Sequence, residues 1–153
     1  LHLAKEPVFD DFHFRIIGQG DLFDEVLSPV RGMENVVIER RFLTHQEIAE
    51  IHKDYGVFLC PTRMDAQGVS RDEAMSSGLV PLTNAVAAIP EFVDERCGIL
   101  APPEDAEGLA RGLKALYEDE RLFQQLSRSA AQRVRRQSSH KQILAKELEL
   151  FHG

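Results

Sequence analysis

Short apolar runs alternate with longer amphipathic stretches along most of this 153-residue chain. The short runs have the length and composition of strands, and the longer stretches repeat their apolar residues at helical spacing. Strands that alternate with helices form a parallel sheet with helices on both faces, so the pattern predicts an α/β fold. The expected strands are Phe12–Gly18, Asn35–Leu43 with its exit, Val57–Cys60, Leu79–Thr83 and Cys97–Ala101.

The stretches between and after these strands predict helices. One of them opens with a capping box, in which Thr44 pairs with Glu47, and ends at Gly56. The wholly apolar run Val57–Cys60 is expected to be covered on both faces. The expected helices are Asp21–Gly32, Thr44–Gly56, Arg71–Ser77, Ile89–Val93, Ala106–Glu118, Arg121–Arg136 and a last segment over Ser139–Phe151. A chain of this length is expected to be a single domain over residues 1–153.

The formal net charge of −7 argues against a nucleic-acid partner, which would require clustered lysine and arginine. The one basic cluster, Arg128–Gln137, has helical spacing. A solvated helix face is its favoured interpretation, and peripheral membrane association of the intact protein is the alternative. No apolar run approaches the ~20 residues of a membrane span, and the first residues lack the apolar core of a signal peptide. A cytoplasmic location is the expectation that follows.

Cysteine and histidine give no sign of a metal site. Cys60 ends the apolar run GVFLC and is expected to be a reduced core residue, and neither Cys60 nor Cys97 lies in a C-x-x-C or metal-ligand spacing. The six histidines are scattered, without the spacing of zinc ligands, and no D-x-D sequence occurs. The sequence therefore predicts neither a metal nor a cofactor.

The segment DAQGVSRDEAMSSGLVP, Asp65–Pro81, has two interpretations. In the first, Ser70 is an N-cap and Glu73 completes a capping box, while Gly78 ends the short helix. In the second, the segment is an anion site. Gly68 allows a close approach of the backbone, and the N–H groups of Gly68, Val69 and Ser70 hold a diphosphate at the helix start. Glu73 and Asp65 then accept hydrogen bonds from ligand hydroxyls.

Position in the sheet favours the second interpretation. The loops GQGD, RFLT and PTRMDAQGVS each follow an expected strand. In parallel α/β folds ligands bind outside the carboxyl ends of the strands, so these loops are expected to lie at one rim. Arg63, in the third loop, is expected to be solvated or structural rather than a ligand cation.

Several segments, in this order and spacing, resemble the C-terminal, donor-binding half of retaining GT-B glycosyltransferases of group 1, also called family 4. They are IIGQGDL, VVIERRFLTHQEIAEIHKDYGVFLCPT, D-x7-E followed by AMSSGLVP, and AIPEFVDERCGILAPPEDAEGLARGLKALYED, and they cover nearly the whole chain. The resemblance implies a Rossmann-like parallel sheet, the C-terminal half of a GT-B fold, with helices at its C-terminus. It also implies binding of a nucleotide-sugar donor, whose sugar the intact enzyme moves to a hydroxyl acceptor with retention.

The resemblance assigns roles by position. Asp65 matches the first acid of the family's Glu-x7-Glu motif, which contacts the transferred sugar, and Glu73 matches the second, which holds the ribose. Gly68, Val69 and Ser70 match the diphosphate-binding amides. Arg41, Phe42 and Leu43 match a loop against the base, and Gly18 and Gly20 match the loop that borders the nucleotide. The catalytic residues are unknown and are expected on the N-terminal, acceptor-binding half, which this sequence does not include.

The sequence departs from the family pattern in three places. Asp65 is shorter than the family's glutamate, and Ala87 and Ala88 stand where the family often has two glycines. The family's first strand, with its Gly-Arg…Lys motif, is absent, and LHLAKEP resembles the tail of the helix that follows it. The chain is therefore expected to be a piece of a two-domain enzyme. Because the absent strand is central in the family's sheet, we expect a gap, an altered strand order, or a partner chain, including a second copy, at that edge.

Two other hypotheses remain open at this point. A dinucleotide-binding oxidoreductase domain would need G-x-G-x-x-G after the first strand, and GQGDLF has only two of those glycines, although Glu39 has the place of the required acid. A non-catalytic α/β interaction module of the receiver type would need an acidic pair at the end of the first strand. Asp10 and Asp11 precede that strand instead.

Overall fold

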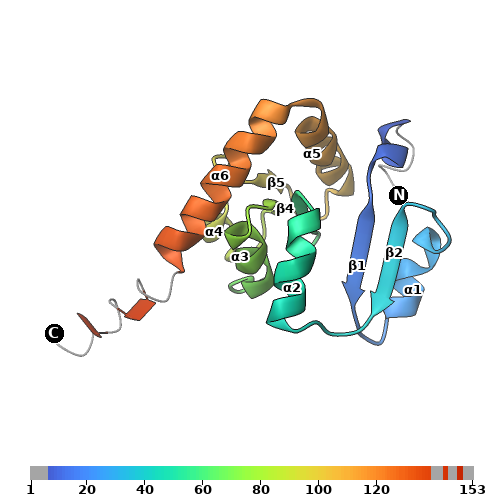
Figure 1. Ribbon diagram of the computed structural model, residues 1–153, viewed down its shortest axis with the longest axis horizontal. Coiled ribbons are helices and arrows are strands. Elements are labelled where there is room, and N and C mark those ends of the chain that lie inside the picture. The colour runs from blue at the N-terminus through green and yellow to red at the C-terminus, as the bar shows by residue number, and fades with distance from the viewer. Residues whose placement is uncertain (1–6, 139–142, 145–147, 150–153) are drawn as a thin grey trace. The chain divides into compact units, whose positions relative to one another are not determined.

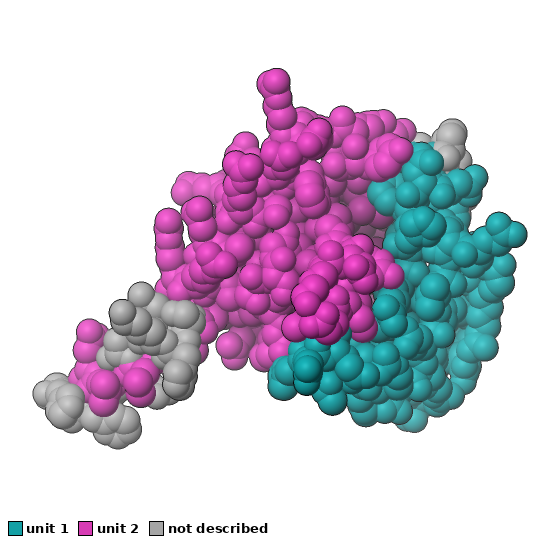
Figure 2. Space-filling view, viewed as in Figure 1, with its two compact units in different colours: residues 1–48 teal, residues 49–153 magenta. Residues whose placement is uncertain are grey.

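The structure is a computed structural model that describes residues 7–138, 143–144 and 148–149 (Figure 1). The chain divides into two compact units, residues 1–48 and residues 49–153, which Figure 2 colours separately. The LHLAKEP segment, except for Pro7, and much of the expected helix over Ser139–Phe151 lie outside the described residues. The single-domain assignment stays a prediction.

Unit 1 is built on two parallel strands, β1 (Phe14–Gly18) and β2 (Val36–Arg40). The crossover between them was expected to be one helix over Asp21–Gly32, but it is shorter and broken. Its elements are α1 (Phe23–Leu27) and the 3-10 turn η3 (Ser28–Val30). Pro29 lies in that turn, and Gly32 leaves it with a φ of +83°. A 3-10 turn, η2 (Pro7–Asp11), precedes β1.

The segment Thr44–Gly56 begins as predicted and ends differently. Helix α2 (His45–Ile51) starts with the expected capping box, because the Thr44 N–H donates to Glu47 Oε2 at 2.8 Å and the Glu47 N–H donates to Thr44 Oγ1 at 3.3 Å. It continues into the 3-10 turn η4 (His52–Asp54). Gly56 is not a left-handed helix end. A Cβ there would lie 2.8 Å from the Phe123 ring, so close packing is what requires glycine at this position.

Unit 2 holds the parallel strands β3 (Val57–Cys60), β4 (Val80–Asn84) and β5 (Ile99–Ala101), in the order β3-β4-β5. All residues of the central strand β4 are buried. Strand β3 is less covered than expected, since Leu59 is 42% exposed at the edge of this sheet. The five strands thus form two sheets rather than one, β1-β2 in unit 1 and β3-β4-β5 in unit 2.

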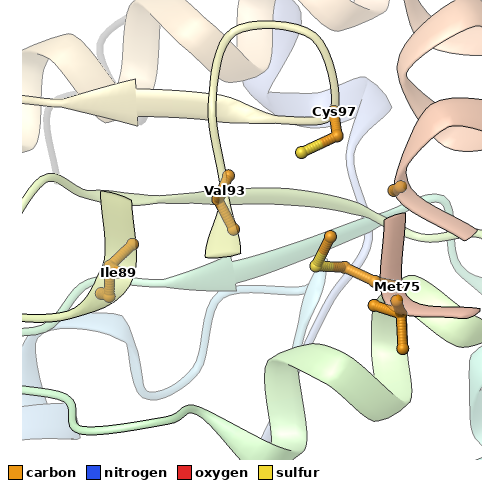
Figure 3. Close-up of a cluster of buried hydrophobic side chains, with 6 residues drawn as sticks. Met75, Ile89, Val93 and Cys97 are labelled. Carbon is orange, nitrogen blue, oxygen red and sulfur yellow. The ribbon is translucent and has the colours of Figure 1, made fainter. Parts of the chain in front are cut away.

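Helices α3 (Val69–Ser76), α4 (Ile89–Phe92), α5 (Ala106–Glu118) and α6 (Glu120–Gln137) complete unit 2. Helix α5 has the predicted bounds, and α6 extends one residue further at each end than expected. Helix α6 packs on α3, α4, α5 and β4. Figure 3 shows the core that results, a cluster that contains Met75, Ile89, Val93 and Cys97 together with Ala130 and Val134 of α6. This packing fixes α3, the helix that carries the predicted site.

Candidate functional site

Helix α3 begins one residue before Ser70, and the predicted capping box does not form. The N-cap is Gly68, with φ 73° and ψ 55°, and no side chain caps the helix. The left-handed conformation of Gly68 turns the chain into the helix directly at Val69. Ser70 is therefore the second helical residue, and Glu73 lies in the second turn, where it cannot complete a cap. The stability interpretation of these two residues is wrong.

The uncapped start of α3 can hold an anion. The first N–H groups of a helix have no acceptor within the helix. The first helical bond here runs from the Asp72 N–H to the Gly68 carbonyl, at 3.0 Å. Val69 and Ser70 are exposed and Gly68 is half-buried. The structure thus brings the three predicted diphosphate-binding residues together at a helix start with open backbone donors.

Glu73 follows on the outer face of the same helix. The inner face consists of Arg71, Asp72, Ala74 and Met75, which are all buried. Helical spacing places the half-buried Glu73 one turn beyond Val69 and Ser70. Its charge also reaches His52. Burial lowers the pKa of His52, and the negative charge of Glu73 opposes that shift.

Asp65 lies on the loop that leads from β3 into α3. Its side chain is half-buried, and Asp65 Oδ2 lies 3.8 Å from Nη1 of Arg71. The Asp65 carbonyl accepts a hydrogen bond of 3.4 Å from the Ala88 N–H, which ties this loop to the loop after β4. The carboxylate is therefore held close to the start of α3 by its neighbours.

Arg71 is the residue of this region that the sequence analysis missed. It is only 2% exposed, and its guanidinium lies among Asp65, Asp72 and the Gln67 carbonyl. A signal was present in the sequence. Position 71 shares a helix face with Ala74 and Met75, and an arginine on an apolar face is a buried charge that needs partners.

The loop after β4 contains a strained alanine. Ala87 has a φ of +47°, in the left-handed region that glycine adopts without strain, whereas Ala88 has an ordinary φ of −85°. Of the two alanines that replace the family's glycines, only Ala87 thus stands where the backbone favours glycine. Arg63 forms an exposed ion pair of 2.6 Å with Glu104, as expected for a structural or solvated residue.

The remaining predicted site residues belong to unit 1. Gly18 ends β1 and Gly20 follows in the loop; neither has a positive φ, and a Cβ on Gly20 would meet nothing within 4 Å. Neither backbone conformation nor packing at Gly20 thus requires glycine. Beyond β2, Phe42 is 77% exposed and Leu43 is half-buried. An exposed ring of this kind is suited to stacking on a base.

Arg41 is held by carboxylates. Its Nε donates to Glu39 Oε2 at 2.8 Å and its Nη1 donates to Glu47 Oε1 at 2.6 Å. These bonds raise the pKa of Arg41, with the Glu39 bond as the largest cause. Glu39 also pairs with Arg15 at 2.6 Å. Arg41 therefore shapes the loop before α2, and its charge is already compensated.

The capping box of Thr44 and Glu47 is expected to make the start of α2 less stable in acid. The Thr44 N–H, followed by Arg41 and the Thr44 hydroxyl, lowers the pKa of Glu47 from 4.5 to about 2. Because the folded pKa is lowered, the stabilisation is complete above pH 4.5 and is lost as the pH falls toward 2. The Glu47→Gln variant should lose less stability than the wild type across this window. Urea unfolding at several pH values tests this, and identical pH profiles would contradict it.

A groove of about 470 Å³ lies at the carboxyl ends of the β3-β4-β5 sheet, next to the start of α5. Among the described residues its lining does not include Asp65, Gly68 or Glu73. It is lined by Pro61, Thr62, Arg63, Asn84, Glu104, Ala106 and Leu109. Asn84 is fixed in this lining, because its Oδ1 accepts a hydrogen bond from the Thr62 N–H and its Nδ2 donates to the Pro102 carbonyl. The groove and the start of α3 are thus separate features of the same unit.

Two searches of the described residues were negative. Within residues 7–138 and the two short described stretches beyond, no three histidine, cysteine or acidic side chains are grouped as they would be around a metal ion. In the same residues, none of the helices combines the length and apolarity that crossing a bilayer requires.

Comparison with known proteins identifies relatives. The family model for glycosyl transferases group 1 matches residues 2–119. No curated protein sequence matches the chain. The match favours the glycosyltransferase hypothesis over the oxidoreductase and interaction-module alternatives.

Solved structures share the fold at low sequence identity. Sucrose-phosphate synthase from Thermosynechococcus elongatus has a TM-score of 0.78 at 19% identity, over 90% of this chain and 37% of that one. A variant of S. aureus TarM, solved with fondaparinux, alpha-GlcNAc-glycerol and UDP, has a TM-score of 0.82 at 19% identity, over 99% and 31%. The C-terminal domain of the group 1 family glycosyl transferase LpcC from Francisella tularensis has a TM-score of 0.76 at 21% identity, over 91% and 77%. The chain thus spans about a third of the length of the first two proteins.

Proposed function

We propose that this chain, which belongs to the group 1 glycosyl transferases, binds the nucleotide-sugar donor of a two-domain glycosyltransferase. The start of α3 holds the diphosphate through the N–H groups of Gly68, Val69 and Ser70. Glu73 accepts hydrogen bonds from the ribose hydroxyls, and Asp65 accepts them from the transferred sugar.

The observation that carries the proposal is the uncapped start of α3. Ser70 and Glu73 are polar residues that would ordinarily cap this helix, yet Gly68 is its N-cap and no side chain bonds the first N–H groups. Capping of this helix therefore does not account for Ser70 and Glu73. An anion at the open donors does, since it satisfies them and interacts favourably with the helix dipole.

In the intact enzyme we propose transfer of the sugar to a hydroxyl acceptor with retention, on a site completed by an N-terminal acceptor-binding half. This chain would position the donor and stabilise the leaving diphosphate. The helix amides take the place that a metal has in D-x-D enzymes, so the reaction is proposed to be metal-independent. Helix α3 belongs to unit 2, which Figure 2 colours magenta. The cytoplasmic location and the membrane and oligomer alternatives stay predictions.

The test is a titration of the chain with UDP, GDP and ADP by calorimetry. At least one should bind, and Glu73→Gln should weaken it about tenfold or more, because a charge-assisted bond to the ribose is lost. Glu91→Gln is the matched control, since Glu91 is an exposed glutamate on helix α4 of the same unit. If the folded chain binds none of the three, or if both variants bind as the wild type does, the proposal is wrong.

A further inference from the structure

The buried guanidinium of Arg71 contacts most of the loop that precedes α3. Its Nη2 donates to the Gln67 carbonyl and to Asp72 Oδ1, the latter at 3.1 Å. Its Nη1 faces Asp65 Oδ2 at 3.8 Å, and its Cζ lies 5.0 Å from the centre of the Phe92 ring. The Arg71 side chain, from the first turn of α3, thus contacts the loop at which the donor is proposed to bind.

Gly68 rests directly on this guanidinium. A Cβ at Gly68 would lie 2.5 Å from Arg71 Nη1 and 2.7 Å from Asp65 Oδ2. The arginine, the aspartate and the N-cap therefore meet at one point. The position of the Asp65 carboxylate relative to the start of α3 is thus set where these three residues meet.

The hydrogen bonding of Arg71 is incomplete. Its Nε and Nη1 are buried and have no hydrogen-bond partner among the described residues. A buried donor without a partner is rare and needs an explanation. Nη1 faces the carboxylate of Asp65 at a distance beyond hydrogen bonding, so a small shift of Asp65 would complete the bond. In a binding site such bonds can tighten when the ligand is held.

We propose that Arg71 is a positioning residue for donor binding, which acts by fixing the Asp65 carboxylate and the 65–68 loop against the start of α3. This inference rests on the proposed function, in which Asp65 faces the sugar. Arg71 itself does not touch the donor. Because the aspartate side chain is short, the loop that carries the Asp65 carboxylate must be held in position. The planar Arg71 guanidinium does this by contacting the loop at two residues.

The inference predicts a specific loss. Without the guanidinium, the loop still has its glycine and α3 still has its open amides, but Asp65 is no longer held. Binding of the nucleoside diphosphate should therefore change little. The additional affinity that the sugar provides should fall, because the sugar is what Asp65 contacts.

The test compares each nucleoside diphosphate with its sugar conjugate on the full 153-residue chain. The pairs are UDP and UDP-glucose, GDP and GDP-mannose, and ADP and ADP-glucose. The main variant is Arg71→Leu with Asp72→Leu, which removes the buried pair together, so that the Asp72 carboxylate is not left without its cation. The dissociation constant of the nucleoside diphosphate divided by that of its sugar conjugate measures the affinity that the sugar adds. This ratio should fall about tenfold in the variant, because one charge-assisted contact is lost. Arg71→Lys, which keeps the charge without the planar fork, should give a partial loss and serves if the double variant does not fold.

A mutant cycle with Asp65→Asn tests whether Arg71 acts through Asp65. Asp65→Asn alone should lower the same ratio, and adding it to the double variant should lower the ratio no further, because both changes remove one interaction. Additive losses would overturn the inference, and so would an unchanged ratio in the double variant. A wild type that binds a nucleoside diphosphate but gains nothing from the sugar also overturns it. If no nucleoside diphosphate binds at all, the proposed function itself fails.

Discussion

Replacing Gly68 with alanine should abolish measurable nucleoside diphosphate binding and destabilise the protein by about 2–4 kcal/mol. Two costs combine at this position. The backbone has a φ of +73°, which alanine adopts only with strain. The new Cβ would also lie 2.5 Å from Arg71 Nη1, and that side chain is buried and cannot move aside without breaking its contacts. Relief of both costs would displace the start of α3, where the phosphate is proposed to bind.

Gly78 at the other end of the same helix provides the matched control. It has a φ of +88°, and the hydrogen bonds around it are those of a Schellman motif, with the Leu79 N–H donating to the Ala74 carbonyl at 3.0 Å. A Cβ there would lie 3.4 Å from Ser127 Oγ, so the space is nearly sufficient. Gly78→Ala should cost only the backbone strain, about 1–2 kcal/mol, and leave binding unchanged. Equal effects of the two substitutions on binding would contradict the assignment of Gly68.

Arg71→Leu alone should destabilise the protein by about 3–5 kcal/mol, because it leaves the buried carboxylate of Asp72 without its cation. Asp72 then keeps the Ser138 hydroxyl, which bonds its Oδ2 at 3.1 Å. A single neutral donor does not compensate a buried charge. Denaturant unfolding monitored by circular dichroism measures the loss.

The companion double variant, with Asp72→Leu added, separates charge from packing. Replacing a buried ion pair by apolar residues of similar size is often neutral or stabilising, so the double variant should recover most of the stability that the single variant loses. A double variant as unstable as Arg71→Leu would contradict this account. It would mean that the arginine stabilises unit 2 through the Gln67 carbonyl and the Phe92 ring rather than by neutralising Asp72.

Local patterns predicted most of the elements. All five strands lie where the apolar runs are, and the leucines of α5 at helical spacing are buried as expected. The Thr44 capping box and the Gly78 helix end are also confirmed. In each case the residues that determine the feature are neighbours in the sequence, so the local pattern contains the information.

The errors arose where side-chain packing determines the role of a residue. The sequence pattern predicts a helix end at Gly56, yet glycine is required there by the Phe123 ring, which is far away in the sequence. The cap of α3 was assigned to Ser70 because its spacing to Glu73 fits a capping box. The left-handed Gly68, packed on Arg71, starts the helix earlier. Neither contact can be derived from spacing alone.

Arg71 shows the same limit within the site. Sequence rules place arginine at the surface, because a fully buried arginine is rare. Its burial follows from the packing of α3 against α6, which are far apart in the sequence, and its charge is paired with its neighbour Asp72 and with Asp65. The acidic residues of the site could be predicted from their order and spacing. For the cation, the sequence contained only the signal that position 71 shares a helix face with Ala74 and Met75.

The central claim is that the open amides at the start of α3 bind the diphosphate of a nucleotide sugar. Titration of the ¹⁵N-labelled chain with UDP, GDP and ADP, followed by amide chemical shifts, tests it most directly. At least one nucleotide should produce saturable shifts that are largest at Gly68, Val69 and Ser70, with Gly98 and Gly112 of the same unit nearly unchanged. Saturable shifts that leave Gly68, Val69 and Ser70 unmoved, or no shifts in a folded chain, would contradict the claim.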